Sequence, residues 1–131
     1  VTVNHRLNAL GYLYLARLDP RFPDSGDAGQ LDLIAALQWV QRNIAAFGGD
    51  PANITVFGQS GGGAKIATLM AMPAAKGLFH KAITMSGQQV TASGPWNATR
   101  RAEAWLDALN LPKERAAEAA TMPVATMPAS P

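Results

Sequence analysis

The residues Gly58-Gln59-Ser60-Gly61-Gly62 match the pattern Gly-x-Ser-x-Gly, in which a tight strand-to-helix turn exposes a serine hydroxyl for nucleophilic attack. The spacing of Gly58 and Gly63, with a lysine soon afterwards, also suggests a phosphate-binding loop, Gly-x-x-x-x-Gly-Lys-[Ser/Thr]. In this chain, however, Ala64 separates Gly63 from the lysine. Moving a lysine by one helical position turns it by about 100° around the axis and away from the anion. The pattern therefore favours a nucleophilic serine.

Such a turn, the nucleophile elbow, needs a strand before the serine and a helix after it. Residues Asn53–Phe57 read as a short buried strand, and a helix is expected from Ser60 or just after it to about Met72. Ser60 would be the nucleophile, and the amide of Gly61 would hold a developing oxyanion at the helix N-terminus. Gly58 and Gly62 would be the elbow glycines, where a side chain is expected to clash.

The rest of the chain alternates strand and helix, which predicts an α/β fold whose parallel sheet is connected by crossover helices. A helix should begin near Asp27, bury one apolar stripe and end at Gly48. The stripe comprises Leu33, Leu37, Val40, Ile44 and Phe47. The other expected elements are strands over 1–4 and 81–87, a helix over 97–109, a weaker helix after Pro112 and a coil tail over 121–131.

Composition limits the possible classes of protein. The 131 residues suffice for one domain, and we expect its core within residues 1–111. A net charge of +2 without basic runs argues against nucleic-acid binding, and no apolar run is long enough to span a bilayer. The absence of cysteine excludes disulfides and thiolate chemistry in this chain. The opening stretch Val1–Asn4 reads as a strand already under way, which suggests a piece of a longer protein.

Three long segments are similar to the type-B carboxylesterases, the α/β-hydrolase family that includes cholinesterases and bacterial para-nitrobenzyl esterases. They are VTVNHRLNALGYL, GDAGQLDLIAALQWVQRNIAAFGGDPANITVFGQSGGG and GLFHKAITMSG. The resemblance runs from Val1 to about Gly87 and is weaker beyond. It implies a partial α/β-hydrolase domain over 1–131, with Ser60 as the nucleophile and Gly61 as one oxyanion donor. The family usually reads Gly-Glu-Ser-Ala-Gly at this turn, so Gln59 and Gly61 depart from its pattern.

The resemblance also implies a small-molecule ester as substrate, an acyl-enzyme intermediate, and neither metal nor cofactor. A serine needs a general base, yet His80 is the one histidine after Ser60. It stands where the family carries a scaffold residue, and His5 precedes the serine, against the family's order of serine, acid and histidine. We therefore expect the base, the acid and the His-Gly-Gly-Gly oxyanion loop in the missing remainder of the fold, and an inactive isolated chain. A non-catalytic binding module, or a serine acyltransferase or peptidase of the same fold, remains an alternative.

Overall fold

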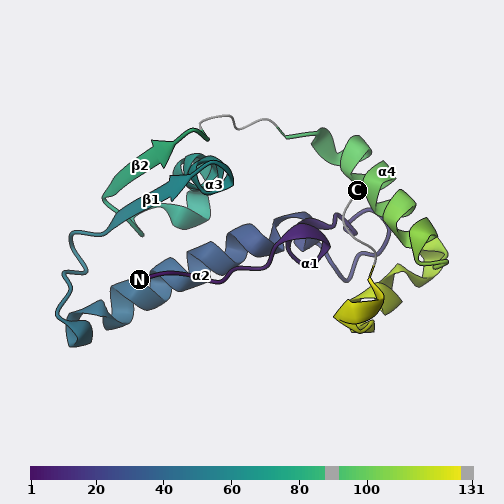
Figure 1. Ribbon diagram of the computed structural model, residues 1–131, viewed down its shortest axis with the longest axis horizontal. Coiled ribbons are helices and arrows are strands. Elements are labelled where there is room, and N and C mark those ends of the chain that lie inside the picture. Colours follow the sequence, from purple (N-terminus) through teal and green to yellow (C-terminus); the bar gives the residue numbers. More distant parts are fainter. Residues whose placement is uncertain (88–91, 128–131) are drawn as a thin grey trace. The chain divides into compact units, whose positions relative to one another are not determined.

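A computed structural model describes residues 1–87 and 92–127 of the chain, which divides into two compact units (Figure 1). Within the described residues, the first unit comprises residues 1–5, 30–87 and 92. The second unit comprises residues 6–29 and 93–127. The Gly-x-Ser-x-Gly turn lies in the first unit.

The long helix of the first unit is α2, Ala28–Asn43, which continues as a 3₁₀ turn over Ile44–Phe47. Gly48 ends it with φ of 80°, and its amide donates to the Ala45 carbonyl at 3.1 Å. A left-handed glycine is a common helix terminus because it has no Cβ to clash. The expected start near Asp27 and the glycine stop are therefore confirmed.

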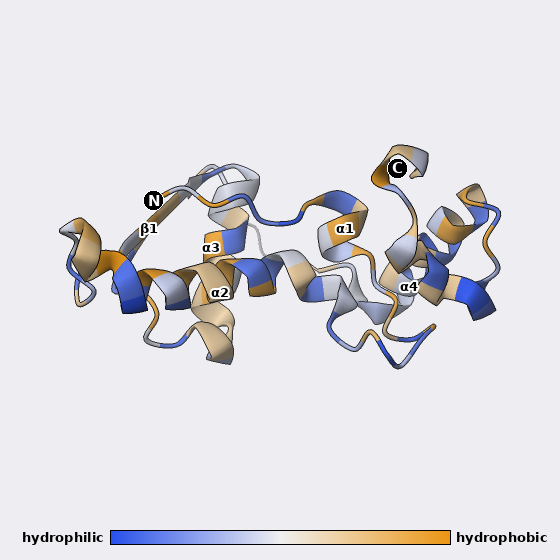
Figure 2. Cartoon of the chain, turned by 90° about the horizontal axis from the view of Figure 1, so that it is seen from below, coloured by the Kyte–Doolittle hydropathy of each residue, from blue (hydrophilic) through white to orange (hydrophobic). Residues whose placement is uncertain are grey.

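The apolar face of α2 is only partly the stripe that the sequence predicts. Leu37 and Ile34 are buried in the core of this unit, while Phe47 is 72% exposed. Burial of Phe47 was wrongly predicted because the last turn is a 3₁₀ helix with about 3.0 residues per turn. That winding displaces the side chain from the α-helical stripe. Figure 2 shows hydrophilic and hydrophobic residues interspersed along α2, as expected for a helix with one buried face.

The sheet has two described strands, β1 (Thr55–Gln59) and β2 (Lys81–Met85), paired in parallel with Phe57 opposite Ile83. β2 lies where it was expected, whereas β1 begins two residues later than the sequence predicts. β1 is not buried on both faces, since Phe57 is 70% exposed. Val1–Asn4 is not a strand in the structure. A strand needs backbone hydrogen bonds to a neighbouring strand. No described segment provides these bonds to Val1–Asn4, so its alternating residues do not form a strand.

Between the strands lies α3, Gly61–Ala71, followed by a 3₁₀ turn over Pro73–Ala75. The helix packs against both strands (Figure 1), so β1, α3 and β2 form one strand–helix–strand unit. Its bounds confirm the predicted helix from just after Ser60 to about Met72. The apolar core of the first unit joins α2, the residue before β1, α3 and the 3₁₀ turn after it, and its buried residues are Ile34, Leu37, Ile54, Leu69 and Ala75.

The second unit is helical over its described residues. It contains α1 (Asn8–Tyr12), a 3₁₀ turn (Ser25–Asp27), α4 (Gly94–Ala108) and 3₁₀ segments over Lys113–Thr121 and Val124–Thr126. Its buried core is formed by Leu15, Ala102, Trp105, Leu106, Leu111, Ala116 and Ala119.

Three predictions for the second unit are corrected. The helix expected over 97–109 begins at Gly94, because Pro95 is pre-organised for a first helical turn. The weaker helix after Pro112 is a 3₁₀ segment kinked at Arg115. The expected coil over 121–131 contains the short 3₁₀ turn at Val124–Thr126, and residues 128–131 lie outside the described residues. Within the described ranges, no helix combines the length and apolarity needed to cross a membrane.

Candidate active site

Ser60 occupies the turn between the last residue of β1, Gln59, and the first residue of α3, Gly61. Its φ of 54° and ψ of −121° match the first central position of a type II′ turn, which glycine normally occupies. Holding serine there costs roughly 1–3 kcal/mol. The Ser60 amide donates to the Met85 carbonyl at 2.8 Å, and its carbonyl accepts from the Ala64 amide at 3.1 Å. The predicted strand–turn–helix setting is confirmed, and Ser60 is exposed.

The glycines around Ser60 have different roles. A Cβ on Gly58 would lie 2.6 Å from the carbonyl carbon of Gly62, so β1 and α3 approach too closely for any side chain there. A Cβ on Gly63 would lie 3.1 Å from the carbonyl oxygens of Gly58 and Met85. These distances explain how α3 packs directly on the sheet. At Gly62 the expectation of a clash is wrong, because a Cβ there meets no described atom within 4 Å.

Gly87, two residues after the end of β2, is a closely packed glycine of the site that the sequence reasoning missed. A Cβ on Gly87 would overlap the carbonyl oxygen of Ser60, so the chain leaving β2 passes directly against the elbow. The preceding residue, Ser86, is exposed and has φ of 52°. The dipeptide Ser86-Gly87 directly after an apolar strand is a turn signal that could have indicated this close approach.

Gly61 begins α3, and the first amides of an α-helix have no acceptor within the helix. The helix dipole adds a partial positive charge at the same end. The Gly61 amide is therefore suited to donate to an anionic oxygen beside Ser60. Its assignment as an oxyanion donor remains a prediction.

His80 lies at the opposite end of the sheet from Ser60. Its Nδ1 accepts a hydrogen bond from the Ile54 amide at 3.0 Å, and its own amide donates to the Ile54 carbonyl at 2.9 Å. Ile54 precedes β1 and Ser60 follows it, and six residues of strand span about 20 Å. His80 therefore binds the backbone at the entry of β1 and cannot take a proton from Ser60.

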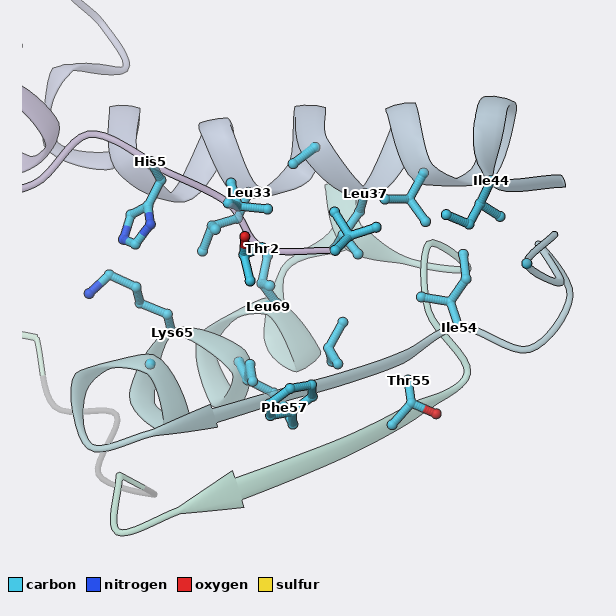
Figure 3. A pocket seen from close by; sticks show the side chains of 18 of the residues that line it. Thr2, His5, Leu33, Leu37, Ile44, Ile54, Thr55, Phe57, Lys65 and Leu69 are labelled. Carbon is cyan, nitrogen blue, oxygen red and sulfur yellow. The ribbon is translucent and has the colours of Figure 1, made fainter. Parts of the chain in front are cut away.

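A cavity of about 580 Å³ lies within the first unit, bordered by the Val1–His5 segment, α2, β1 and α3. Its walls are largely apolar, with Leu33, Leu37, Ile44, Ile54, Phe57 and Leu69 among the lining residues. Figure 3 shows the imidazole of His5 and the ammonium group of Lys65 gathered at one end of the cavity. The Nε2 atom of His5 is buried and has no hydrogen-bond partner among the described residues. Residues 1–87 and 92–127 contain no cluster of three or more acidic or histidine side chains suited to a metal ion.

Comparison with known proteins places this geometry in context. The model of the carboxylesterase family matches residues 1–122 of the chain. The para-nitrobenzyl esterase of Bacillus subtilis (strain 168) is 56% identical over 91 residues, which cover 70% of this chain and 18% of that protein. Carboxylesterase 3 of Homo sapiens is 50% identical over 100 residues, which cover 73% of this chain and 17% of that protein.

Solved structures give the same relationship. A structure named PNB esterase superposes with a TM-score of 0.86 at 45% identity, covering 94% of this chain and 26% of that one. An esterase from Clostridium hathewayi, described as able to hydrolyse aliphatic aromatic polyesters, superposes with a TM-score of 0.83 at 47% identity. That match covers 95% of this chain and 25% of the other. The predicted α/β-hydrolase fold is confirmed, and the chain spans about a sixth of the length of its curated relatives.

Proposed function

The chain belongs to the carboxylesterase family, and on that premise we propose that the whole protein hydrolyses carboxylic esters with Ser60 as its nucleophile. The observation that carries the proposal is the backbone of Ser60, held at φ of 54° and ψ of −121° at the carboxyl end of β1. A strained, exposed serine directly before a helix N-terminus is the arrangement in which α/β-hydrolases present their nucleophile.

The reaction begins when the Ser60 Oγ forms a bond to the ester carbonyl carbon. The carbonyl π electrons move onto its oxygen, the serine proton passes to a histidine base, and the Gly61 amide donates to the oxyanion. The carbon–oxygen bond to the alcohol then breaks, and the alcohol leaves with the proton from that histidine. Water then attacks the acyl carbon of the acyl-enzyme and gives a proton to the histidine. The bond from that carbon to Ser60 Oγ breaks, Ser60 regains the proton from the histidine, and the carboxylic acid leaves. The substrate is a small-molecule ester.

We infer that the base and the acid come from parts of the whole protein outside these 131 residues. His80 is committed to the backbone at the far end of the sheet, and the chain spans only 18% of the Bacillus subtilis relative. A triad without its base and acid loses on the order of 10⁶-fold in turnover rate. The isolated chain should therefore hydrolyse para-nitrophenyl esters scarcely faster than buffer does.

The proposal is tested by labelling the whole protein with a fluorophosphonate probe, which phosphonylates activated serines. The labelled peptide should contain Ser60, and Ser60→Ala should abolish both labelling and ester hydrolysis. Ser86→Ala is a matched control, since Ser86 is also exposed, has positive φ and directly follows the neighbouring strand. Labelling of a different residue, or normal hydrolysis by Ser60→Ala, would disprove the assignment.

The same experiment separates the alternative functions of this fold. A non-catalytic binding module would not react with the probe under conditions that label active serine hydrolases. An acyltransferase or peptidase would react, but its products would differ. Product analysis with an ester, an amide and a competing alcohol acceptor distinguishes hydrolysis from these activities.

A further inference from the structure

Gln59, the last residue of β1, directly precedes Ser60. Its partner in the parallel ladder is Met85, whose carbonyl oxygen accepts the Ser60 amide at 2.8 Å. The Cα atoms of two consecutive residues are about 3.8 Å apart. The end of the ladder therefore holds Gln59 at a fixed, short distance from the proposed nucleophile.

The side chain of Gln59 lies on the face of β1 that points away from α3. Successive side chains of a strand alternate between its two faces. Gly58 lies on the face that packs on α3, since a Cβ there would be 2.6 Å from the Gly62 carbonyl carbon, whereas Phe57 and Gln59 are exposed. Ser60 is exposed as well, so an ester that approaches its hydroxyl over this face passes beside Gln59.

The charge of this face differs from what the family's usual motif would give. Gly-Glu-Ser-Ala-Gly places an ionised carboxylate directly before the serine, and this chain has a neutral carboxamide of nearly the same size there. Neither β1 nor β2 contains an aspartate or a glutamate. A negatively charged group that approaches Ser60 over this face of the sheet therefore meets no like charge from either strand. Specificity often depends on such repulsion, so its absence widens the range of substrates.

We propose that Gln59 is a specificity-determining residue of the ester hydrolase, whose neutral side chain admits esters with a negatively charged acyl chain. The inference rests on the proposed function of Ser60 and deepens it by naming a substrate class, esters whose acyl chain ends in a carboxylate. A charge at position 59 and the end of such a chain would be about 8 Å apart. Coulomb's law with an effective dielectric constant of about 40, between water and a protein surface, then changes the rate about fivefold.

The test compares Gln59→Glu with Gln59→Lys in the whole protein. The substrates are mono-para-nitrophenyl adipate, which is negatively charged, and para-nitrophenyl hexanoate, which is neutral and has the same number of acyl carbons. The measured quantity is kcat/KM for the charged ester divided by kcat/KM for the neutral ester. This ratio should fall about fivefold in Gln59→Glu and rise in Gln59→Lys. Salt at 1 M should reduce both changes, because the Debye length is then about 3 Å.

Two control variants separate charge at position 59 from other effects. Thr55 is exposed on the same face of β1, four residues before Gln59, which places it about 13 Å further from Ser60. Thr55→Glu should therefore change the ratio less than twofold. Gln59→Met removes the carboxamide without adding charge, and it should also change the ratio less than twofold.

Several results would overturn the inference. One is a ratio that stays the same in both Gln59→Glu and Gln59→Lys, since the side chain then does not border the bound ester. Another is a change in the same direction in both variants, or an equal change in Thr55→Glu, since neither depends on charge beside the nucleophile. If Gln59→Glu does not fold, the rise expected in Gln59→Lys and its loss in salt still decide the question. Normal hydrolysis of the neutral ester by Ser60→Ala would refute the proposed function itself, independently of any result at Gln59.

Discussion

Replacing Ser60 by glycine should stabilise the whole protein while abolishing its activity. The φ of 54° and ψ of −121° at Ser60 fall outside the left-handed helical region, where φ is about +50 to +70° and ψ about +30 to +60°. Serine in such a conformation costs roughly 1–3 kcal/mol, whereas glycine adopts it without a steric penalty. Glycine also gives the unfolded chain more freedom, which costs about 0.4–1 kcal/mol. The net gain in unfolding free energy should be about 0.5–2 kcal/mol.

Ser60→Ala is the matched control for this prediction. Alanine removes the same hydroxyl but keeps a Cβ, so it retains the backbone strain. Because Ser60 is exposed, Ser60→Ala should lie within about 0.5 kcal/mol of the unaltered protein. The difference in unfolding free energy between the two variants therefore measures the backbone strain separately from the loss of the hydroxyl.

Urea unfolding of both variants, followed by fluorescence, measures this difference. If the unfolding slopes agree, the shift in midpoint gives the change in stability directly. A Ser60→Gly midpoint at or below that of Ser60→Ala would show that the turn is not strained, and the observation that carries the proposed function would be lost. Both variants should be inactive towards para-nitrophenyl esters.

Further substitutions test other parts of the site. Gly58→Ala should destabilise the whole protein by about 1–3 kcal/mol, because its Cβ would overlap the start of α3. Gly62→Ala should be neutral or stabilising by up to about 1 kcal/mol. Thermal unfolding compares the two variants, and equal effects on stability would contradict the assigned packing. His80→Ala should lower the stability of the protein by about 1–3 kcal/mol, because it leaves the backbone amide of Ile54 unpaired. The fraction that remains folded should keep its kcat. A loss of several orders of magnitude in kcat would instead identify His80 as the base. Phe57 and Ile83 lie exposed and opposite each other on the sheet. In the isolated 131-residue chain, replacing both by Thr should therefore reduce self-association, measured by light scattering. Unchanged self-association would show that this face of the sheet does not cause it.

The elements predicted correctly are those whose signals are local. The α2 stop at Gly48 follows from the left-handed conformation that glycine tolerates, and the start of α3 follows from the elbow pattern itself. The parallel pairing of the two strands follows from a helix of crossover length between them. Each of these depends on residues that are close together in the sequence.

The errors have a different origin, since they concern what surrounds an element. The run at Val1–Asn4 has the alternation of a strand, but pairing depends on a neighbour that its own residues cannot specify. The apolar character of β1 predicts burial on both faces, yet cover for the Phe57 face must come from another segment. At Gly87 the dipeptide Ser86-Gly87 is a local turn signal, but the sequence does not show that the close contact is with Ser60, far away in the chain.

The two ends of the sheet differ in how their polar groups are paired and in how strained the backbone is. At the amino end, polar groups pair with one another, since His80 binds the Ile54 backbone and the Lys81 ammonium donates to the Asn53 side chain at 2.9 Å. At the carboxyl end, Ser60 is strained and exposed, and glycines bring the backbones around it into close approach. Satisfied hydrogen bonds stabilise a fold, whereas strain persists only where the surrounding structure enforces it. This asymmetry supports the proposal that the chemistry takes place at the carboxyl end, as the parallel sheet of an α/β protein leads one to expect.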